Sequence, residues 1–288
     1  MRYRFIEKRR SNYLIASMCA LLGVSRSGYY AWRKRKPSQR EEENQTLIEH
    51  IRRIHRLSRR AYGSPRVYAQ LRRQGFTCGR KRIARLMRLD GLQGRRKHRR
   101  VITTNSKHAF PIAPNMLNRD FQAFKPNQKW VADITYIPTE EGWLYLAGVM
   151  DLFSRKIVGW EMSSQIDATL VENALRMALY QRHPDQGLLH HSDRGCQYAS
   201  SLIRNILDAN QIQVSMSGKG NCYDNAVIES FWGTLKNEWV HHQKYQTRYQ
   251  ARTDIFAYIE GFYNTVRLHS SLGYLSPVEY ESKYQSYP

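Results

Sequence analysis

The sequence predicts two parts: a basic, all-α region, and an α/β domain in which helices flank a mixed five-stranded sheet. Three observations support this prediction. Up to residue 94, apolar residues recur at helical steps of three and four, with turn signals between the runs. From residue 129 to residue 240, strand-like and helix-like runs follow in the order βββαβαβα. The balance of charge also changes between the two parts.

Positive charge is concentrated in the front of this 288-residue chain, whose formal net charge is +22. Residues 1–110 hold 30 Lys and Arg against 6 Asp and Glu, whereas residues 111–288 hold 16 against 18. This asymmetry predicts a polyanion-binding region joined to a near-neutral domain that carries the chemistry. The alternative is a basic solvated surface that binds nothing.

Residues 1–36 are predicted to form a small helix-turn-helix. The apolar positions of its first helix are Leu14, Ile15, Met18, Leu21 and Leu22. Gly23 begins a turn, and Ser25 is the expected N-cap of the second helix. Such a unit would place Arg26 and Arg33 near DNA. A helical hairpin that merely packs on the next domain would show the same pattern.

Residues 37–94 are predicted to form a second helix-turn-helix DNA-binding domain. A first helix is expected to end near residue 57, and Ser64 is expected to cap a second, with Pro65 at its first position. A third helix is predicted over Arg80–Leu89. Its outward face carries the arginines expected to meet DNA phosphates, which are Arg82, Arg85 and Arg88.

Two further segments flank the sheet-forming domain. The basic linker 95–128 begins with three more expected DNA contacts, Arg95, Arg96 and Lys97. A solvated, disordered segment would have the same composition. Behind the domain, residues 241–288 predict one more helix and a tail. In that tail Arg267 either contacts DNA or braces the helix before it.

Three acidic residues stand out within the domain 129–240. Asp133 lies in a strand-like run, Asp193 ends another apolar run, and Glu229 lies in a helical pattern that covers 221–239. Asn225 and Lys236 share a helix face with Glu229 and are expected to contact DNA. A lone Glu on a helix is ordinarily a solvated surface residue. The 35 residues between Asp193 and Glu229 suggest another role.

Four motifs carry a resemblance over nearly the whole chain. They are W-x-x-D-I-T-Y at 130–136, H-S-D-R-G at 191–195, D-N-A-x-x-E-S-F-W-x-x-L-K at 224–236 and Y-N-x-x-R-x-H-S-S-L-G-Y-x-S-P at 263–277. On these residues the chain resembles the DDE transposase/integrase superfamily. More narrowly, it resembles the second-frame transposases of bacterial insertion sequences, whose cores are similar to those of retroviral integrases. The resemblance implies an RNase H-like fold.

The resemblance also implies a reaction and its ligands. Asp133 would bridge two Mg²⁺ ions, Asp193 and Glu229 would each hold one, and Mn²⁺ would substitute. Two such ions activate the attacking oxygen and stabilise the leaving oxygen in phosphodiester chemistry, and Mg²⁺ prefers oxygen ligands. Water attacks in cleavage, and a freed DNA 3′-OH attacks in strand transfer. Asp151 occupies a position where the family carries an acid without a catalytic role.

The same resemblance implies partners. The expected partner is double-stranded DNA, namely the terminal inverted repeats of an insertion element and a target. Joining the two ends through a circular intermediate requires at least a homodimer on DNA. A fusion to, or partnership with, the product of an upstream reading frame is also implied.

Two other functions remain open from the sequence. One is a DNA-binding protein without activity, against which the complete acidic triad argues. The other is a non-transposing nuclease, which would not need the basic helical region. The scattered cysteines, with no CxxC pair, predict neither a zinc site nor a disulfide framework. With no apolar run of membrane-spanning length and no signal peptide, we expect a cytoplasmic, nucleoid-associated protein.

Overall fold

The computed structural model describes residues 1–95, 112–218 and 222–285. The chain divides into two compact units, Met1–His50 and Ile51–Pro288. Among the described residues, no helix combines the length and the apolar character that a membrane span requires.

The first unit contains three short helices around a small core. They are α1 (Arg2–Arg9), α2 (Ile15–Leu21) and α3 (Arg26–Lys34). The core consists of Ile6, Met18, Cys19 and Tyr29. Ser25 caps α3 as predicted, because its hydroxyl accepts a hydrogen bond from the amide of Gly28 at 3.0 Å. The predicted apolar face was wrong in part, since Leu14 and Leu21 are 77% and 88% exposed.

The basic region continues with α4 (Gln39–Leu57), α5 (Ser64–Arg73) and α6 (Arg80–Leu89). The boundary between the two units falls within α4. In α6, the residues Ile83, Leu86 and Met87 are buried. The predicted cap of α5 was wrong by one residue. Gly63 is the N-cap and makes no side-chain hydrogen bond, so Ser64 is already helical.

The second unit is built on a mixed five-stranded sheet, as predicted. The strands are β1 (Lys129–Thr139), β2 (Gly142–Asp151), β3 (Ile157–Ser163), β4 (Leu189–Ser192) and β5 (Gln213–Met216). Their order across the sheet is β3-β2-β1-β4-β5. The first three form an antiparallel meander, and β4 and β5 run parallel to β1. The first strand is therefore central and pairs with β4, which follows much later in the sequence.

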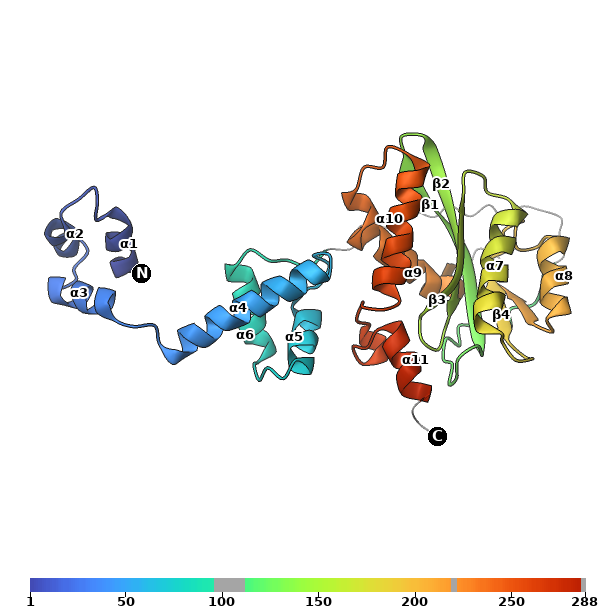
Figure 1. Ribbon diagram of the computed structural model, residues 1–288, viewed down its shortest axis with the longest axis horizontal. Coiled ribbons are helices and arrows are strands. Elements are labelled where there is room, and N and C mark those ends of the chain that lie inside the picture. The colour runs from blue at the N-terminus through green and yellow to red at the C-terminus, as the bar shows by residue number, and fades with distance from the viewer. Residues whose placement is uncertain (96–111, 219–221, 286–288) are drawn as a thin grey trace. The chain divides into compact units, whose positions relative to one another are not determined.

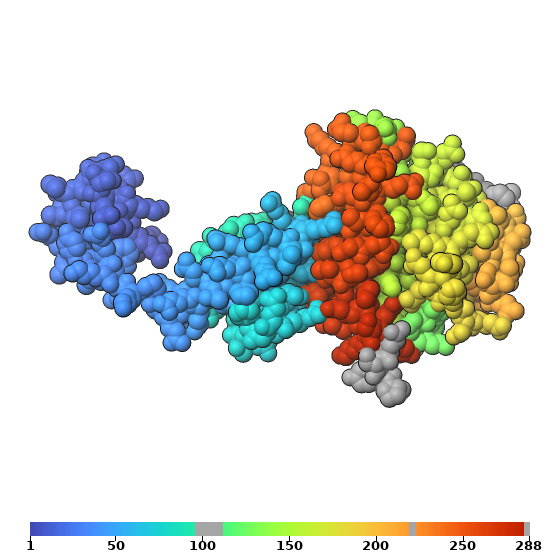
Figure 2. Space-filling view, viewed as in Figure 1, coloured from blue at the N-terminus to red at the C-terminus, as the bar shows by residue number. Residues whose placement is uncertain are grey.

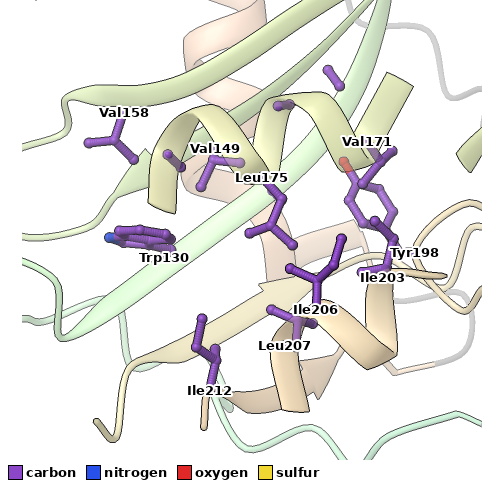
Figure 3. Packing of buried hydrophobic residues seen from close by; sticks show 14 of the residues in the cluster. Trp130, Val149, Val158, Val171, Leu175, Tyr198, Ile203, Ile206, Leu207 and Ile212 are labelled. Carbon is purple, nitrogen blue, oxygen red and sulfur yellow. The ribbon is translucent and has the colours of Figure 1, made fainter. Parts of the chain in front are cut away.

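Helices cover both faces of this sheet (Figure 1). The helices α7 (Ala168–Arg182) and α8 (Ser201–Ala209) lie on one face, and α9 (Ala226–Glu238) and α10 (Arg248–Tyr258) lie on the other. The first pair encloses the main hydrophobic core, where Trp130 of β1 and Leu175 of α7 are almost fully buried (Figure 3). Because this core fixes β1 and β4, it also fixes the acidic residues that these strands carry.

The C-terminal segment, which ends in α11 (Pro277–Gln285), runs along one side of the core (Figure 2). Side chains of the basic region hold it by its main chain. The donors Arg59, Tyr62 and Arg66 bond to the carbonyl oxygens of Ala257, Val266 and Leu268 at 3.0, 3.2 and 2.9 Å. The amide of Leu268 also donates to the Tyr62 hydroxyl at 2.7 Å. We call this set of contacts the carbonyl clasp.

Candidate active site

Two acidic residues lie side by side because their strands are parallel neighbours. Ala132 of β1 pairs with Ser192, the last residue of β4, and the residues that follow these two in the chain are Asp133 and Asp193. Adjacent strands lie about 4.8 Å apart. The sheet register alone therefore brings together two aspartates that are 60 residues apart in the sequence.

Helix α9 is attached to β1 on both sides of Glu229. One turn before Glu229, the Asn225 side-chain amide donates to the carbonyl oxygen of Ala132 at 2.9 Å. One turn after it, the indole N–H of Trp232 donates to Oδ2 of Asp133 at 3.0 Å. Residues three and four apart share a helix face. Glu229 therefore lies on the face of α9 that is applied to the Asp133 region of the strand.

The electrostatics of neighbouring groups are consistent with this arrangement. Tyr198, buried beside the strands (Figure 3), has a pKa raised well above its ordinary value by burial, and then by the nearby charges of Asp133 and Asp193. The charges of both carboxylates therefore act on the pKa of the same phenol. Burial lowers the pKa of Lys236, and Asp133 opposes that shift. The ammonium of Lys236 lies 4.5 Å from the ring centre of Tyr136, at the edge of the same site.

Gly148 makes room for the indole that holds Asp133. Gly148 pairs with Asp133 across β1 and β2. A Cβ at this position would lie 2.7 Å from Cη2 of Trp232, closer than atoms pack in proteins. A side chain at residue 148 would therefore push the indole away from the strand.

We expect Gly148→Ala to lower the free energy of unfolding by about 1–3 kcal/mol, the usual cost of overpacking a close-packed interior. Urea denaturation measures this. Gly261→Ala is the control, because a Cβ there meets nothing within 4 Å and no positive φ is recorded there. Equal unfolding free energies for the two variants would contradict the assigned role of Gly148.

The three carboxylates are drawn to one place, but they do not form a closed coordination shell. Among the residues that the structure describes, no three His, Cys, Asp or Glu side chains converge closely enough to hold one metal ion. Their donor type nevertheless fits Mg²⁺ or Mn²⁺, because both favour oxygen ligands. Two of them are already oriented: the amides of Ile134 and Gly195 donate to Asp133 and Asp193, each at 2.9 Å. Sharing an ion requires the side chains to close further, and catalytic contacts often tighten when substrate binds.

Three polar residues near the carboxylates are buried and hold the fold together. Asp224 precedes Asn225, the N-cap of α9, and accepts a hydrogen bond from the Arg119 guanidinium at 3.1 Å. Asn225 is 3% exposed and bonded to β1, so in this conformation it holds the helix and does not contact DNA. Arg267 is likewise buried, and it pairs with Glu238 at 2.6 Å. Of the two roles considered for Arg267, bracing α9 is the one the structure supports.

Asp151 has no part in this site. Its carboxylate is fully buried and accepts hydrogen bonds from the Arg182 guanidinium at 3.0 Å and from the amides of Asn127 and Phe153, each at 2.9 Å. It therefore fixes the turn after β2 and the entry to β1.

The other expected DNA contacts are spread over the basic region. Arg26, Arg33, Arg85 and Arg88 are exposed, and Arg82 and Arg95 are half-buried. Arg96 and Lys97 lie outside the described residues. Lys236 is half-buried at the edge of the site. Exposure is compatible with phosphate contacts, which remain a prediction for these residues.

The two histidines before Asp193 are core residues. Both ring nitrogens of His191 lie near hydroxyls, at 2.8 Å from Ser215 and 3.1 Å from Ser217. Neither ring nitrogen of His190 has a hydrogen-bond partner within the described parts of the chain. Burial lowers the pKa of each from 6.5 to about 4. Both imidazoles are therefore neutral at neutral pH.

Acidification should destabilise the fold through His190 and His191. In the unfolded chain each binds a proton below about pH 6.5, whereas the folded chain resists protonation down to about pH 4. The stability they contribute is thus complete above pH 6.5 and is lost as the pH falls. From pH 7 to pH 5 we expect a loss of about 2 kcal/mol per histidine. Urea denaturation across this range measures it, and a flat profile would contradict it.

Sequence reasoning missed two residues of this site. Trp232 lies within the helical pattern predicted over 221–239, but nothing in the sequence marks it as a partner of Asp133. Tyr198 was not singled out at all. The spacing of Trp232, three residues after Glu229, was the only available signal.

Comparison with known proteins adds independent observations. Two family models described as "Integrase core domain" match residues 123–222 and 210–277, and an "HTH-like domain" model matches residues 42–100. The chain is 41% identical over 285 residues to transposase InsF for insertion sequence IS3A of Escherichia coli, covering 98% of this chain and 99% of that protein. It is 46% identical over 267 residues to an uncharacterized 31 kDa protein of insertion element IS600 from Shigella sonnei, covering 93% of this chain and 98% of that protein.

Solved structures with a similar shape are more distant in sequence. The HTLV-2 integrase catalytic core domain, solved in complex with magnesium, aligns with a TM-score of 0.44 and 14% identity. That alignment covers 56% of this chain and 99% of the viral domain.

Proposed function

Because this chain belongs to the integrase-core transposases of IS3-type insertion sequences, we propose that it binds the terminal inverted repeats of its own element and cuts and joins DNA with Asp133, Asp193 and Glu229. One observation supports this assignment above all. The pairing of Ala132 with Ser192 sets two aspartates side by side, and the Asn225 and Trp232 contacts apply the Glu229 face of α9 to the same strand.

We propose Mg²⁺ as the cofactor, as two ions, with Mn²⁺ as a substitute. Asp133 would contact both ions, and Asp193 and Glu229 would each contact one. Bound ions would neutralise charge on the scissile phosphate and raise the reactivity of the attacking oxygen. The chain's own part is orientation: Trp232 and the amide of Ile134 each hold one oxygen of Asp133, and the amide of Gly195 holds Asp193.

The basic helices would supply DNA binding. Arg26, Arg33, Arg85 and Arg88 are exposed and suited to phosphate contacts, which position a protein on DNA without reading its sequence. Lys236 would approach a phosphate beside the carboxylates. Two element ends must meet in one complex, so we expect at least a dimer on DNA. Cooperation with an upstream-frame product and a nucleoid-associated location belong to the same proposal.

Removing metal should stop chemistry and leave binding. Wild-type protein with a duplex of the element end and Mg²⁺ is expected to give cleaved and joined products on a sequencing gel. EDTA is expected to abolish both products, whereas the protein should still retard the same duplex in a gel-shift experiment. Mn²⁺ should restore both.

A duplex with a scrambled end sequence serves as the control, and it should be bound less tightly and not joined. Nicking without joining would indicate a nuclease instead. A shift without any product in Mg²⁺ would indicate a DNA-binding protein that lacks activity.

A further inference from the structure

A cavity of about 510 Å³ lies against the face of α9 next to the one that carries Glu229. Part of its wall is formed by four residues of this helix segment, Ala226, Ser230, Gly233 and Asn237. Each of them comes one position after a residue of the face applied to β1, which carries Asn225, Glu229, Trp232 and Lys236. One residue along a helix corresponds to a rotation of about 100°. The candidate active site and this cavity therefore occupy adjacent faces of a single helix.

The cavity is strongly cationic. Four arginines line it, with Glu238 as the only acidic residue among the lining residues, and these arginines are Arg66, Arg95, Arg155 and Arg267. The Glu238 carboxylate accepts hydrogen bonds from the Arg267 guanidinium at 2.6 and 2.7 Å. The Arg66 guanidinium lies further from it, at 3.5 Å. One carboxylate thus faces four guanidinium groups. Buried like charges are costly unless a counter-charge is supplied.

Arg155 makes this excess plain. It lies in the turn between β2 and β3 with a left-handed backbone (φ 62°), and its amide donates to the carbonyl oxygen of Asp151. An arginine in a hairpin turn ordinarily extends into water. Here its Nη1 is buried, and no hydrogen-bond partner for it exists in the described parts of the chain. The same holds for Nη1 of Arg95.

The arginines also converge on one point. Nε2 of His269 lies 3.4 Å from Nη1 of Arg267. Burial first, and then the charges of Arg267, Arg66 and Arg155, lower the pKa of His269 to about 2. The imidazole is therefore neutral and adds no charge. Three guanidinium groups act on it, and two of them, those of Arg267 and Arg66, share the single carboxylate of Glu238.

We infer that this cavity binds a phosphodiester group of the DNA substrate, with Arg155 as its principal ligand and Arg66 and Arg95 beside it. The inference rests on the proposed function, because it takes DNA as the substrate. Guanidinium groups form forked hydrogen bonds with phosphate oxygens. Ser230 and Thr234 of α9 add hydroxyls to the wall. A strand held here would pass the carboxylates on the neighbouring face of the same helix.

Replacing Arg155 tests the inference in the full-length protein. Arg155→Gln removes the charge and keeps a donor. We expect about tenfold weaker binding of the element-end duplex in 0.15 M salt, measured by fluorescence anisotropy in EDTA. We also expect the slope of log affinity against log salt to fall by about 1, which is the loss of one phosphate contact. Loss of a merely structural contact would leave that slope unchanged.

The control is Arg176→Gln, an exposed arginine on α7 that pairs with Glu172 of the same helix. It should leave affinity and slope unchanged. Inorganic phosphate, compared with chloride at equal ionic strength, should raise the melting temperature of wild type and of Arg176→Gln but not of Arg155→Gln. Protection by phosphate without any change in DNA binding would mean a site for the free anion, which overturns the inference.

A folded Arg155→Gln protein with wild-type affinity and slope would also overturn it. If that variant does not fold, wild-type protein gives the answer: DNA should protect Arg155, and not Arg176, from modification by phenylglyoxal, as read by mass spectrometry. Lack of protection refutes the site. All these readouts measure binding without metal. Failure of the proposed chemistry would appear separately, as wild-type protein that binds DNA but does not cut it.

Discussion

Replacement of Glu229 by glutamine is expected to reduce DNA cleavage and joining by about 10³-fold or more while DNA binding persists. A metal-held charge at a phosphoryl centre contributes several kcal/mol to transition-state stabilisation, and about 1.4 kcal/mol corresponds to a factor of ten in rate. Glutamine has nearly the same shape as glutamate but lacks its charge. Asn225 and Trp232 hold α9 on either side of residue 229, so the helix should keep its position in the variant.

The measurement is single-turnover cleavage and strand transfer on the element-end duplex in Mg²⁺. Glu172→Gln is the matched control, because Glu172 lies on another helix of the same domain and pairs with Arg176 there. That variant should retain wild-type rates. Circular dichroism and gel shift should show both variants folded and bound to DNA. Activity of Glu229→Gln within tenfold of wild type would remove Glu229 from the catalytic group.

Replacement of Glu238 by glutamine should lower the free energy of unfolding by about 3–5 kcal/mol, the cost of breaking a buried ion pair from one side. Glu238 ends α9 and accepts both hydrogen bonds of the Arg267 fork and one from the Tyr258 hydroxyl at 3.1 Å. The Glu238 and Arg267 side chains are only 10% and 5% exposed. Without the carboxylate, Arg267 and Arg66 would repel each other with no counter-charge between them.

Urea denaturation followed by tryptophan fluorescence measures the effect. Glu161→Gln is the control, since its pair with Arg252 is exposed, at 30% and 45% of the two side chains. Exposed pairs contribute about 0–1 kcal/mol. A loss for Glu238→Gln no larger than that of the control would show that the pair does not hold the tail to α9. DNA cleavage by Glu238→Gln should also fall, because the helix that Glu238 ends carries Glu229.

The sequence predicted the strands and helices of the core well because their patterns are local. Asp167 caps α7, its carboxylate accepting from the amide of Leu170 at 2.9 Å, and three successive strand-like runs predicted β1 to β3. Helical spacing also placed Asn225, Glu229 and Lys236 on one face. Spacing could not reveal that this face covers β1, so the burial of Asn225 was missed.

The remaining errors have one physical cause. Arg267 and Glu238 lie 29 residues apart, and Arg66 and Glu238 lie 172 apart. Whether an arginine meets DNA or a buried carboxylate depends on such distant partners, which local patterns do not contain. Trp232 was missed for the same reason, because its partner Asp133 is 99 residues away. Even the exposure of Leu14 depends on how three short helices pack.

The carbonyl clasp has a consequence for how relatives of this chain diverge. In three of its four hydrogen bonds the donors are the side chains of Arg59, Tyr62 and Arg66, and the acceptors are main-chain oxygens, which every amino acid possesses. In the fourth, the main-chain amide of Leu268 donates to the Tyr62 hydroxyl. Substitutions at residues 257, 266 and 268 that keep the backbone path would leave those bonds in place. Selection to keep these contacts therefore restricts the side chains of Arg59, Tyr62 and Arg66 more than the side chains at residues 257, 266 and 268. A chimeric protein whose last forty residues or so come from a relative should still bind this segment in the same place, provided that the three donor side chains are retained.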